Sequence, residues 1–185
     1  MAEAATTGFN ISTFQAALSS QGARPNLFNM SLTVPSAVTG VVNTSFEKLC
    51  KTAQIPGSTI GVVEVQYFGR PVKMPGNRTF ENLTTTIIND EGFVLREALE
   101  DWMKFLNDHE KNTTTSTEAS SFFGSLSLQQ YSRDGNTDIN PYVFNNAWPV
   151  NLAPIDLDWG TNDTIEEFTV EWAYDWWSGG GAKSS

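Results

Sequence analysis

The chain has 185 residues, with 39% hydrophobic and 12% aromatic side chains, and a formal net charge of −10. This composition is typical of one globular domain with a sizeable core, and the acidic balance argues against a protein that grips nucleic acid through Lys and Arg. Cys50 is the only cysteine, so an internal disulfide is excluded, and we interpret it as a small buried residue. Neither a signal peptide nor an apolar run of ~20 residues is evident, so we expect no membrane insertion.

Residues 1–22 are small and polar, with a weak helical pattern, and we interpret them as an N-terminal arm. A β pattern begins near Arg24. Strands are predicted at residues 24–34, 49–55 and 58–69, where β-branched and aromatic side chains are frequent.

Residues 69–79 combine two prolines, two glycines and three basic side chains. This composition predicts a hairpin extension or a long loop. Arg70, Lys73 and Arg78 form the only local basic cluster of the chain. Two interpretations of it stay open: a solvated hairpin, or an element that docks on an acidic partner surface.

Residues 79–90 alternate between Leu83 and Ile87 on one face and Thr84 and Thr86 on the other, which predicts a strand with one polar, uncharged face.

The strongest helical pattern spans residues 92–108. Its apolar stripe is formed by Leu95, Leu99, Trp102, Met103 and Leu106. We expect Asn89 or Asp90 to cap the start of this helix, and Glu100 and Lys104 to form an i,i+4 ion pair on its outer face.

Further strands are predicted at residues 122–135 and 141–154, the second interrupted by Pro149. Residues 155–163 alternate apolar and acidic side chains before a turn, and residues 178–185 are interpreted as a flexible tail. Seven or eight strands and one helix predict a mainly β fold, an antiparallel β-sandwich or barrel with one packed amphipathic α-helix.

The segment 164–177 is the most informative strand prediction. One face carries Phe168, Val170, Trp172, Tyr174 and Trp176. The other carries Glu167, Thr169, Glu171 and Asp175. Large rings must be buried, whereas unpaired carboxylates need water or a cation. The sheet is therefore expected to have an aromatic back and an acidic front.

Candidate chemistry is weak throughout the sequence. His109, the only histidine, follows the predicted helix and is interpreted as a charge at its carbonyl end. Asp156 and Asp158 resemble the start of a calcium loop, but Thr161 stands where an EF-hand has glycine. Carboxylate pairs could serve a glycosidase, although acidic strand faces without catalysis are commoner. We predict no catalytic residue, no metal site and no cofactor.

Five segments in one order along residues 23–177 resemble the tail tube proteins of contractile-tailed, T4-like bacteriophages. They are ARPNLFNMSL, IPGSTIG, PGNRTFENLTTTIINDEG with the following LREALEDWMKFLN, QYSRDG, and WPVNLAPIDLDWGTNDTIEEFTVEWAYDW. Each segment alone is a weak signal, whereas their joint order is specific. We expect residues 23–177 to form the tail tube domain.

The resemblance implies a structural virion protein without enzymatic activity or cofactor. Its copies are expected to form hexameric rings that stack into the inner tail tube, whose channel passes double-stranded DNA without specific binding. The implied partners are other copies of the chain, the tail sheath protein, the baseplate and the tail terminator proteins. The implied location is the virion tail, after assembly in the host cytoplasm.

Two sets of site residues follow from this picture. The residues expected to contact the next ring are Arg70, Lys73, Arg78, Trp176 and Trp177. The residues expected to face the channel are Thr84, Thr86, Glu167, Glu171 and Asp175. Two alternatives remain: a tube protein of a non-phage contractile injection system, and a carbohydrate-binding or carbohydrate-hydrolysing β-sandwich.

Overall fold

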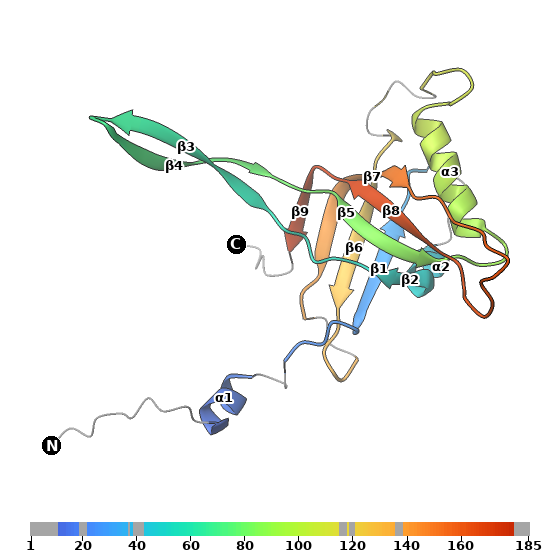
Figure 1. The fold of residues 1–185 in the computed structure, drawn as a ribbon, viewed down its shortest axis with the longest axis horizontal. Helices are drawn as coiled ribbons and strands as arrows, with labels where there is room; N and C mark the ends of the chain where they lie inside the picture. Colours follow the sequence, from blue (N-terminus) through green and yellow to red (C-terminus); the bar gives the residue numbers. More distant parts are fainter. Residues whose placement is uncertain are drawn as a thin grey trace.

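The computed structural model describes residues 11–18, 22–36, 38, 43–114, 118, 121–135 and 139–179. Within these residues the helices are α1 (Ile11–Ala17), α2 (Asn43–Leu49) and α3 (Val94–Leu106). The strands are β1 (Phe28–Thr33), β2 (Cys50–Thr52), β3 (Thr59–Tyr67), β4 (Arg70–Thr79), β5 (Leu83–Ile88), β6 (Gly124–Gln130), β7 (Tyr142–Leu152), β8 (Glu167–Ala173) and β9 (Trp176–Gly179). Figure 1 shows a curled sheet with α3 packed beside it and a long β3–β4 hairpin projecting from it. The prediction of a mainly β, antiparallel fold with a packed amphipathic helix is confirmed.

The large sheet has seven antiparallel strands in the order β1-β6-β7-β8-β5-β2, with β9 also paired to β7. One edge of β7 pairs with β9 along its first half and with β8 along its second half. The prediction of one strand at 164–177 is therefore wrong in extent, because the chain bends at Tyr174 and Asp175. The bend lies beside Asn146 of β7, whose φ of 55° breaks the regular pleat.

Two other expectations need correction. Pro149 does not interrupt β7: the register shifts between Pro149 and Asn151, and this irregularity accommodates a residue that has no N–H to donate. Residues 155–163, whose alternation of apolar and acidic side chains is typical of a strand, form a loop in which Trp159 is 100% exposed. At the carboxyl end, β9 continues to Gly179, two residues beyond the predicted end of the domain.

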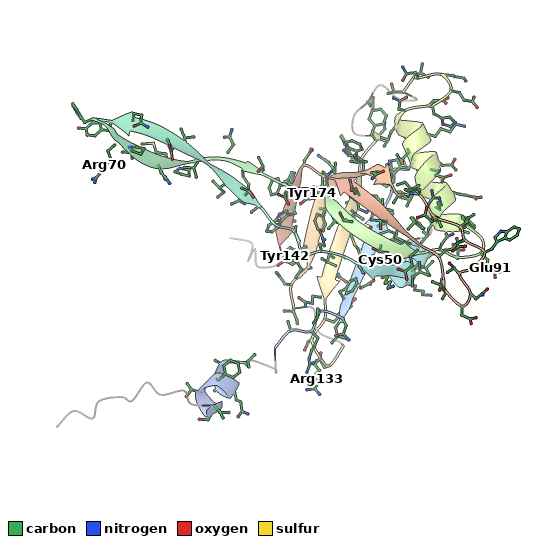
Figure 2. The ribbon with its side chains drawn as sticks, in the orientation of Figure 1. Cys50, Arg70, Glu91, Arg133, Tyr142 and Tyr174 are labelled. Carbon is green, nitrogen blue, oxygen red and sulfur yellow. The ribbon has the colours of Figure 1, made fainter. Side chains whose placement is uncertain are left out.

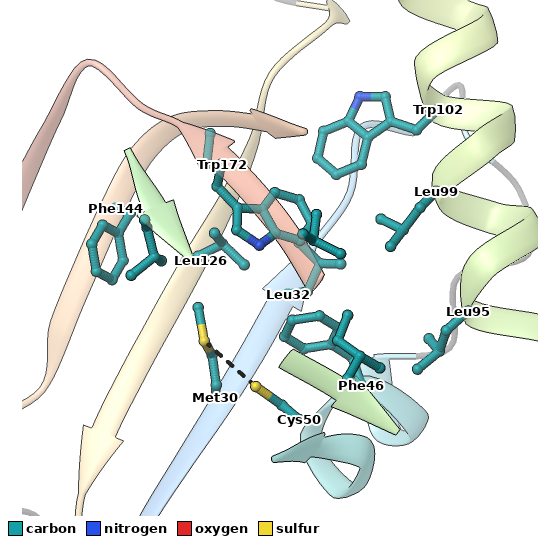
Figure 3. Close-up of a cluster of buried hydrophobic side chains, with 14 of the residues drawn as sticks. Met30, Leu32, Phe46, Cys50, Leu95, Leu99, Trp102, Leu126, Phe144 and Trp172 are labelled. Carbon is teal, nitrogen blue, oxygen red and sulfur yellow. Dashed lines mark hydrogen bonds between the residues drawn. The ribbon is translucent and has the colours of Figure 1, made fainter. Parts of the chain in front are cut away.

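The core lies between one face of the large sheet and the helices α2 and α3 (Figure 3). Alternation along each strand places every second side chain in it. The largest fully buried side chains are Met30, Leu32, Phe46, Ile87, Leu95, Leu99, Trp102, Leu126, Phe144, Phe168, Val170 and Trp172. Trp172 is central, with ring centroids 6.2 Å from Phe46 and 5.9 Å from Trp102. Its indole N–H donates to the Thr85 hydroxyl at 2.9 Å, so this buried donor is satisfied.

Helix α3 buries the predicted stripe through Leu95, Leu99 and Trp102. The expected cap is wrong, because the residue preceding the helix is Phe93, with φ 52° and no side-chain cap bond. Asn89 instead donates its side-chain amide to the Glu166 carboxylate at 3.0 Å. The expected pair of Glu100 with Lys104 is replaced by one with Arg96, at 3.0 Å on the preceding turn.

Candidate assembly surfaces

The face of the large sheet that points away from the core is built from short polar side chains, and we call it the polar face. On β1 and β6 the paired residues are Asn29–Gln129, Ser31–Ser127 and Thr33–Ser125. On β5 and β8 they are Thr84–Glu171, Thr86–Thr169 and Ile88–Glu167. Directly opposed residues share one side of a sheet, so hydroxyl and amide groups line the two halves of this face. Between them, Val143 of β7 lies opposite Ser127.

This sheet carries very few charges. Its seven strands contain one basic residue, Lys51 of β2, and two acidic residues, Glu167 and Glu171 of β8. The Lys51 ammonium lies 2.5 Å from a Glu167 carboxylate oxygen. The acidic face predicted for residues 164–177 is thus partly neutralised by Lys51, and the one basic side chain of these strands is already paired.

The structure brings together four of the five residues that we expected to face a channel. Thr84, Thr86, Glu167 and Glu171 lie on the polar face of β5 and β8. Asp175 lies instead at the bend between β8 and β9, where its carboxylate accepts a hydrogen bond of 2.7 Å from the Asn146 side-chain amide. Its contact is therefore local to the bend.

The β3–β4 hairpin stands clear of the large sheet (Figure 1), and its register gives it two different faces. We call one the apolar face of the hairpin, formed by Val63, Val65, Tyr67, Val72 and Met74. All five side chains are exposed. The opposite face carries Glu64 and Lys73, whose charged groups lie 3.9 Å apart. A two-stranded hairpin is marginally stable alone, so an exposed apolar face of this size indicates a partner surface.

The three basic residues do not form one patch. Arg70 lies at the tip of the hairpin (Figure 2), Lys73 pairs with Glu64, and Arg78 lies opposite Ile60 near the root. At ~3.3 Å per residue, Arg70 and Arg78 are roughly 26 Å apart along β4. The interpretation of residues 69–79 as a hairpin extension is confirmed, and the basic side chains are distributed along its length.

The two tryptophans of β9 differ in their surroundings. Trp177 packs on Tyr142, with ring centroids 5.6 Å apart, and its indole N–H donates to the Gly57 carbonyl at 3.3 Å. Trp176 is 50% exposed. Only Trp176 therefore presents much of its ring to a second molecule.

The candidate chemical groups are inert or isolated. Burial raises the pKa of the Cys50 thiol from 9.0 to about 12, so the thiol stays protonated and unreactive at neutral pH. Its sulfur lies 4.0 Å from the sulfur of Met30, inside the core. No group of three or more His, Cys, Asp or Glu side chains is placed to hold a metal in the described part of the chain. Over the same residues, no helix is long and apolar enough to span a membrane.

Sequence reasoning missed the apolar face of the hairpin and the residue at its tip. The alternation of Val63, Val65 and Tyr67 was available as a signal, but a buried strand shows the same pattern. Phe68 followed by Gly69 marked the turn, and only the structure shows that the Phe68 ring is 93% exposed.

Comparison with known proteins agrees with this architecture. A family model described as phage tail tube protein matches residues 23–179. The tail tube protein gp19 of Enterobacteria phage T4 is 29% identical over 155 residues, covering 84% of this chain and 90% of that protein. The tail tube protein of Serratia phage KSP90 is 29% identical over 126 residues, covering 68% of this chain and 70% of that protein.

A solved structure with the same fold is a chain of the sheath–tube complex, in its extended state, of the extracellular contractile injection system PVC. Its TM-score is 0.63 at 17% identity, with 90% of this chain and 96% of that chain covered. Tail tube proteins are structural, so the prediction of a structural virion protein without enzymatic activity is confirmed. The match over residues 23–179, together with the T4 relative, shows that the chain belongs to the phage tail tube protein family.

Proposed function

We propose that copies of this chain form hexameric rings that stack into the inner tube of a contractile tail, with the polar face lining a channel for double-stranded DNA. The observation that carries this proposal is the charge content of the large sheet, whose one cation, Lys51, is paired with Glu167. Proteins hold DNA by placing Lys and Arg against phosphates. A surface of hydroxyl and amide groups binds water and offers no free cation to the phosphates, so DNA slides past it.

The two edges of the large sheet support the closure of a ring, because each edge can pair with a neighbouring copy. β1 and β2 are the two ends of the strand order, so each has one edge where, among the described residues, no further strand pairs with its backbone N–H and C=O groups. Such edges invite pairing with another chain. Edge-to-edge pairing between neighbouring copies satisfies these groups and continues the polar face around the ring. Six copies carry a formal charge of −60, which adds long-range repulsion of DNA.

Stacking of rings is assigned to the β3–β4 hairpin. Its apolar face needs cover, and Arg70, Lys73 and Arg78 supply charges along β4 that suit the acidic surface of another copy. Trp176 is a secondary candidate for the same contact, because half of its surface is exposed. Trp177 is held within its own subunit, where its ring packs on Tyr142.

The proposed partners outside the tube are the sheath around it and the baseplate and terminator at its ends. Support comes from the solved neighbours, which were determined in a sheath–tube complex and in a baseplate. Assembly in the host cytoplasm, without membrane insertion, completes the proposal. The PVC neighbour keeps a tube of a non-phage injection system as the second candidate, because it shares the fold.

Negative-stain electron microscopy of the purified protein tests the assembly itself. We expect rings with six-fold symmetry, or tubes built from them. A protein that stays monomeric at high concentration and over a range of salt concentrations would refute the proposal.

Cysteine labelling tests which face lines the channel. Cys50 is buried and protonated, so an introduced cysteine is the only reactive thiol. In tubes, Thr86→Cys on the polar face should react with a small maleimide but be protected from a bulky polymer-linked maleimide. Asp101→Cys, on the exposed side of α3, is the matched control and should react with both. Equal labelling of the two variants by the bulky reagent would show that the polar face lies outside.

Charge reversal tests the stacking role of the hairpin. Replacing Arg70, Lys73 and Arg78 together by Glu should leave the subunit folded and shorten the tubes. Unchanged tube length in electron micrographs would remove the basic residues from the ring-to-ring contact. Lys104→Glu, on α3, is the matched control for a change of charge elsewhere.

A further inference from the structure

The turn at the tip of the hairpin places an aromatic side chain, that of Phe68, on a backbone conformation that aromatic residues rarely adopt. Phe68 and Gly69 connect β3 to β4, with φ of 45° and 81°. A two-residue turn of this kind needs left-handed backbone at both positions and favours Asn, Asp or Gly at the first. Phe68 is instead 93% exposed, and its ring packs edge-on against Tyr67, with centroids 4.7 Å apart. A strained, exposed ring at an extremity indicates a binding role rather than a folding role.

A pocket of matching character lies at the other end of the same hairpin. It has a volume of about 350 Å³ and is walled by Phe28, Ala53, Ile55, Leu128 and Tyr142. Among the described residues that line it, none is charged. An apolar cavity of ~150 Å³ holds a benzene ring, so this pocket has room for one phenyl ring and part of a second. Gln54 and Gln130 add polar groups that can meet a phenol hydroxyl.

The tip cannot fill the pocket of its own chain. Ile55 lies four residues before the start of β3, and Phe68 lies at the far end of the hairpin, thirteen residues after Ile55. At ~3.3 Å per residue in an extended ribbon, the two positions are roughly 40 Å apart. Figure 1 shows the hairpin pointing away from the sheet ends that form the pocket. The Phe68 ring can therefore reach such a pocket only on another molecule.

We infer that Phe68 of one copy, with Tyr67 beside it, inserts into the Phe28–Ile55–Tyr142 pocket of the next copy. This inference rests on the proposed assembly of the chain into stacked rings. Because the inserted ring and the pocket lie on different parts of the subunit, the contact is head-to-tail, and its repetition continues a stack instead of closing a pair of molecules. Insertion also brings the apolar face of the hairpin along the neighbouring copy, which covers the exposed side chains between tip and root.

Site-specific photocrosslinking tests the contact directly. The probe is p-benzoylphenylalanine in place of Phe68, which keeps an aromatic ring at the tip. In tubes assembled from this variant, irradiation should cross-link the probe to a second copy. The cross-linked peptide of that copy should contain Ala53–Ile55 or Leu128. Tubes whose cross-links map elsewhere on the neighbour, or that give no intermolecular cross-link, would overturn the inference.

Substitutions separate binding from folding. Phe68→Asn suits the left-handed backbone, so the subunit should remain folded, whereas the concentration needed for tube formation should rise at least tenfold. Phe68→Tyr keeps the ring and should assemble nearly as the unmodified chain does. Tubes of Phe68→Asn that form at the unmodified concentration would contradict the inference.

A matched pair of substitutions tests the pocket in the same way. Ile55→Asp places a charge in the pocket and should weaken assembly as Phe68→Asn does. Ile165→Asp, at an exposed isoleucine outside the pocket, should not. Equal effects of the two changes would count against the pocket. If the unmodified chain forms no rings or tubes, the proposed function fails; if tubes form but the Phe68 experiments fail, only this inference falls.

Discussion

Replacing Trp102 by alanine tests whether the stripe of α3 is the centre of the core. The Trp102 side chain is fully buried and its ring lies against that of Trp172. Its indole N–H donates to the Phe122 carbonyl at 3.0 Å. The change therefore removes a large apolar volume, an aromatic contact and a hydrogen bond at one position.

The structure places the cost at the upper end of the usual range. Trp-to-Ala changes in cores cost about 3–5 kcal/mol of the free energy of unfolding. The site cannot easily collapse, because the sheet backbone at Gly124 already touches the Trp102 ring: a Cβ built there would lie 2.8 Å from it. Losing the hydrogen bond adds about 1 kcal/mol. We therefore expect a loss of about 4–5 kcal/mol.

Trp102→Phe is the matched control, because it keeps most of the apolar contact and loses the donor, for an expected cost of about 1–2 kcal/mol. The measurement is urea unfolding followed by far-ultraviolet circular dichroism, on dispersed subunits, since assembly would add concentration-dependent stability. A loss below about 1 kcal/mol for Trp102→Ala would show that the stripe does not hold the helix on the sheet.

Three further predictions address single contacts. Thr85→Val should cost about 1–3 kcal/mol in the same unfolding assay, because the buried indole N–H of Trp172 loses its acceptor; a neutral result would contradict that bond. Gly124→Ala should destabilise strongly or prevent folding, because the added Cβ would lie 2.3 Å from the Thr33 carbonyl oxygen; normal thermal unfolding would show that β1 and β6 can separate. Cys50 should react with a thiol reagent at pH 8 only as fast as the protein unfolds, and rapid labelling would place the thiol outside the core. Since the folded thiol has a pKa of about 12 and the unfolded thiol about 9.0, its contribution to the free energy of unfolding is present below pH 9 and is lost as the pH rises toward 12.

Period-two alternation located the strands that bury one face. The Leu83, Thr85 and Ile87 series and the Phe168, Val170 and Trp172 series are buried as expected. Alternation reports which side chains share a face, and a buried face leaves a strong pattern in the sequence. Extents were less predictable, because the bend after Ala173 depends on Asn146, a residue of another strand.

Local patterns also misplaced contacts that depend on distant partners. The local pattern predicts Asn89 as a helix cap, yet its side-chain amide donates a hydrogen bond to the Glu166 carboxylate. Glu167 looks like a free acid of the strand face, yet it pairs with Lys51, 116 residues away in the sequence. Competition between a local and a distant hydrogen-bond partner is decided by the folded geometry, which no local pattern encodes.

By itself, the sequence determined the β-rich class, the amphipathic helix, the two-faced strand within residues 164–177 and the resemblance that indicated the family. These features are local or lie in the order of segments along one chain. Only the tertiary structure showed that polar residues from β1, β6, β5 and β8 share one nearly uncharged face, and that Phe68 and the Ile55 pocket lie at opposite ends of one hairpin. The polar face and the pocket both combine strands that are distant in the sequence. The register of strand pairing decides which residues lie opposite one another, and the sequence of a single strand does not determine that register.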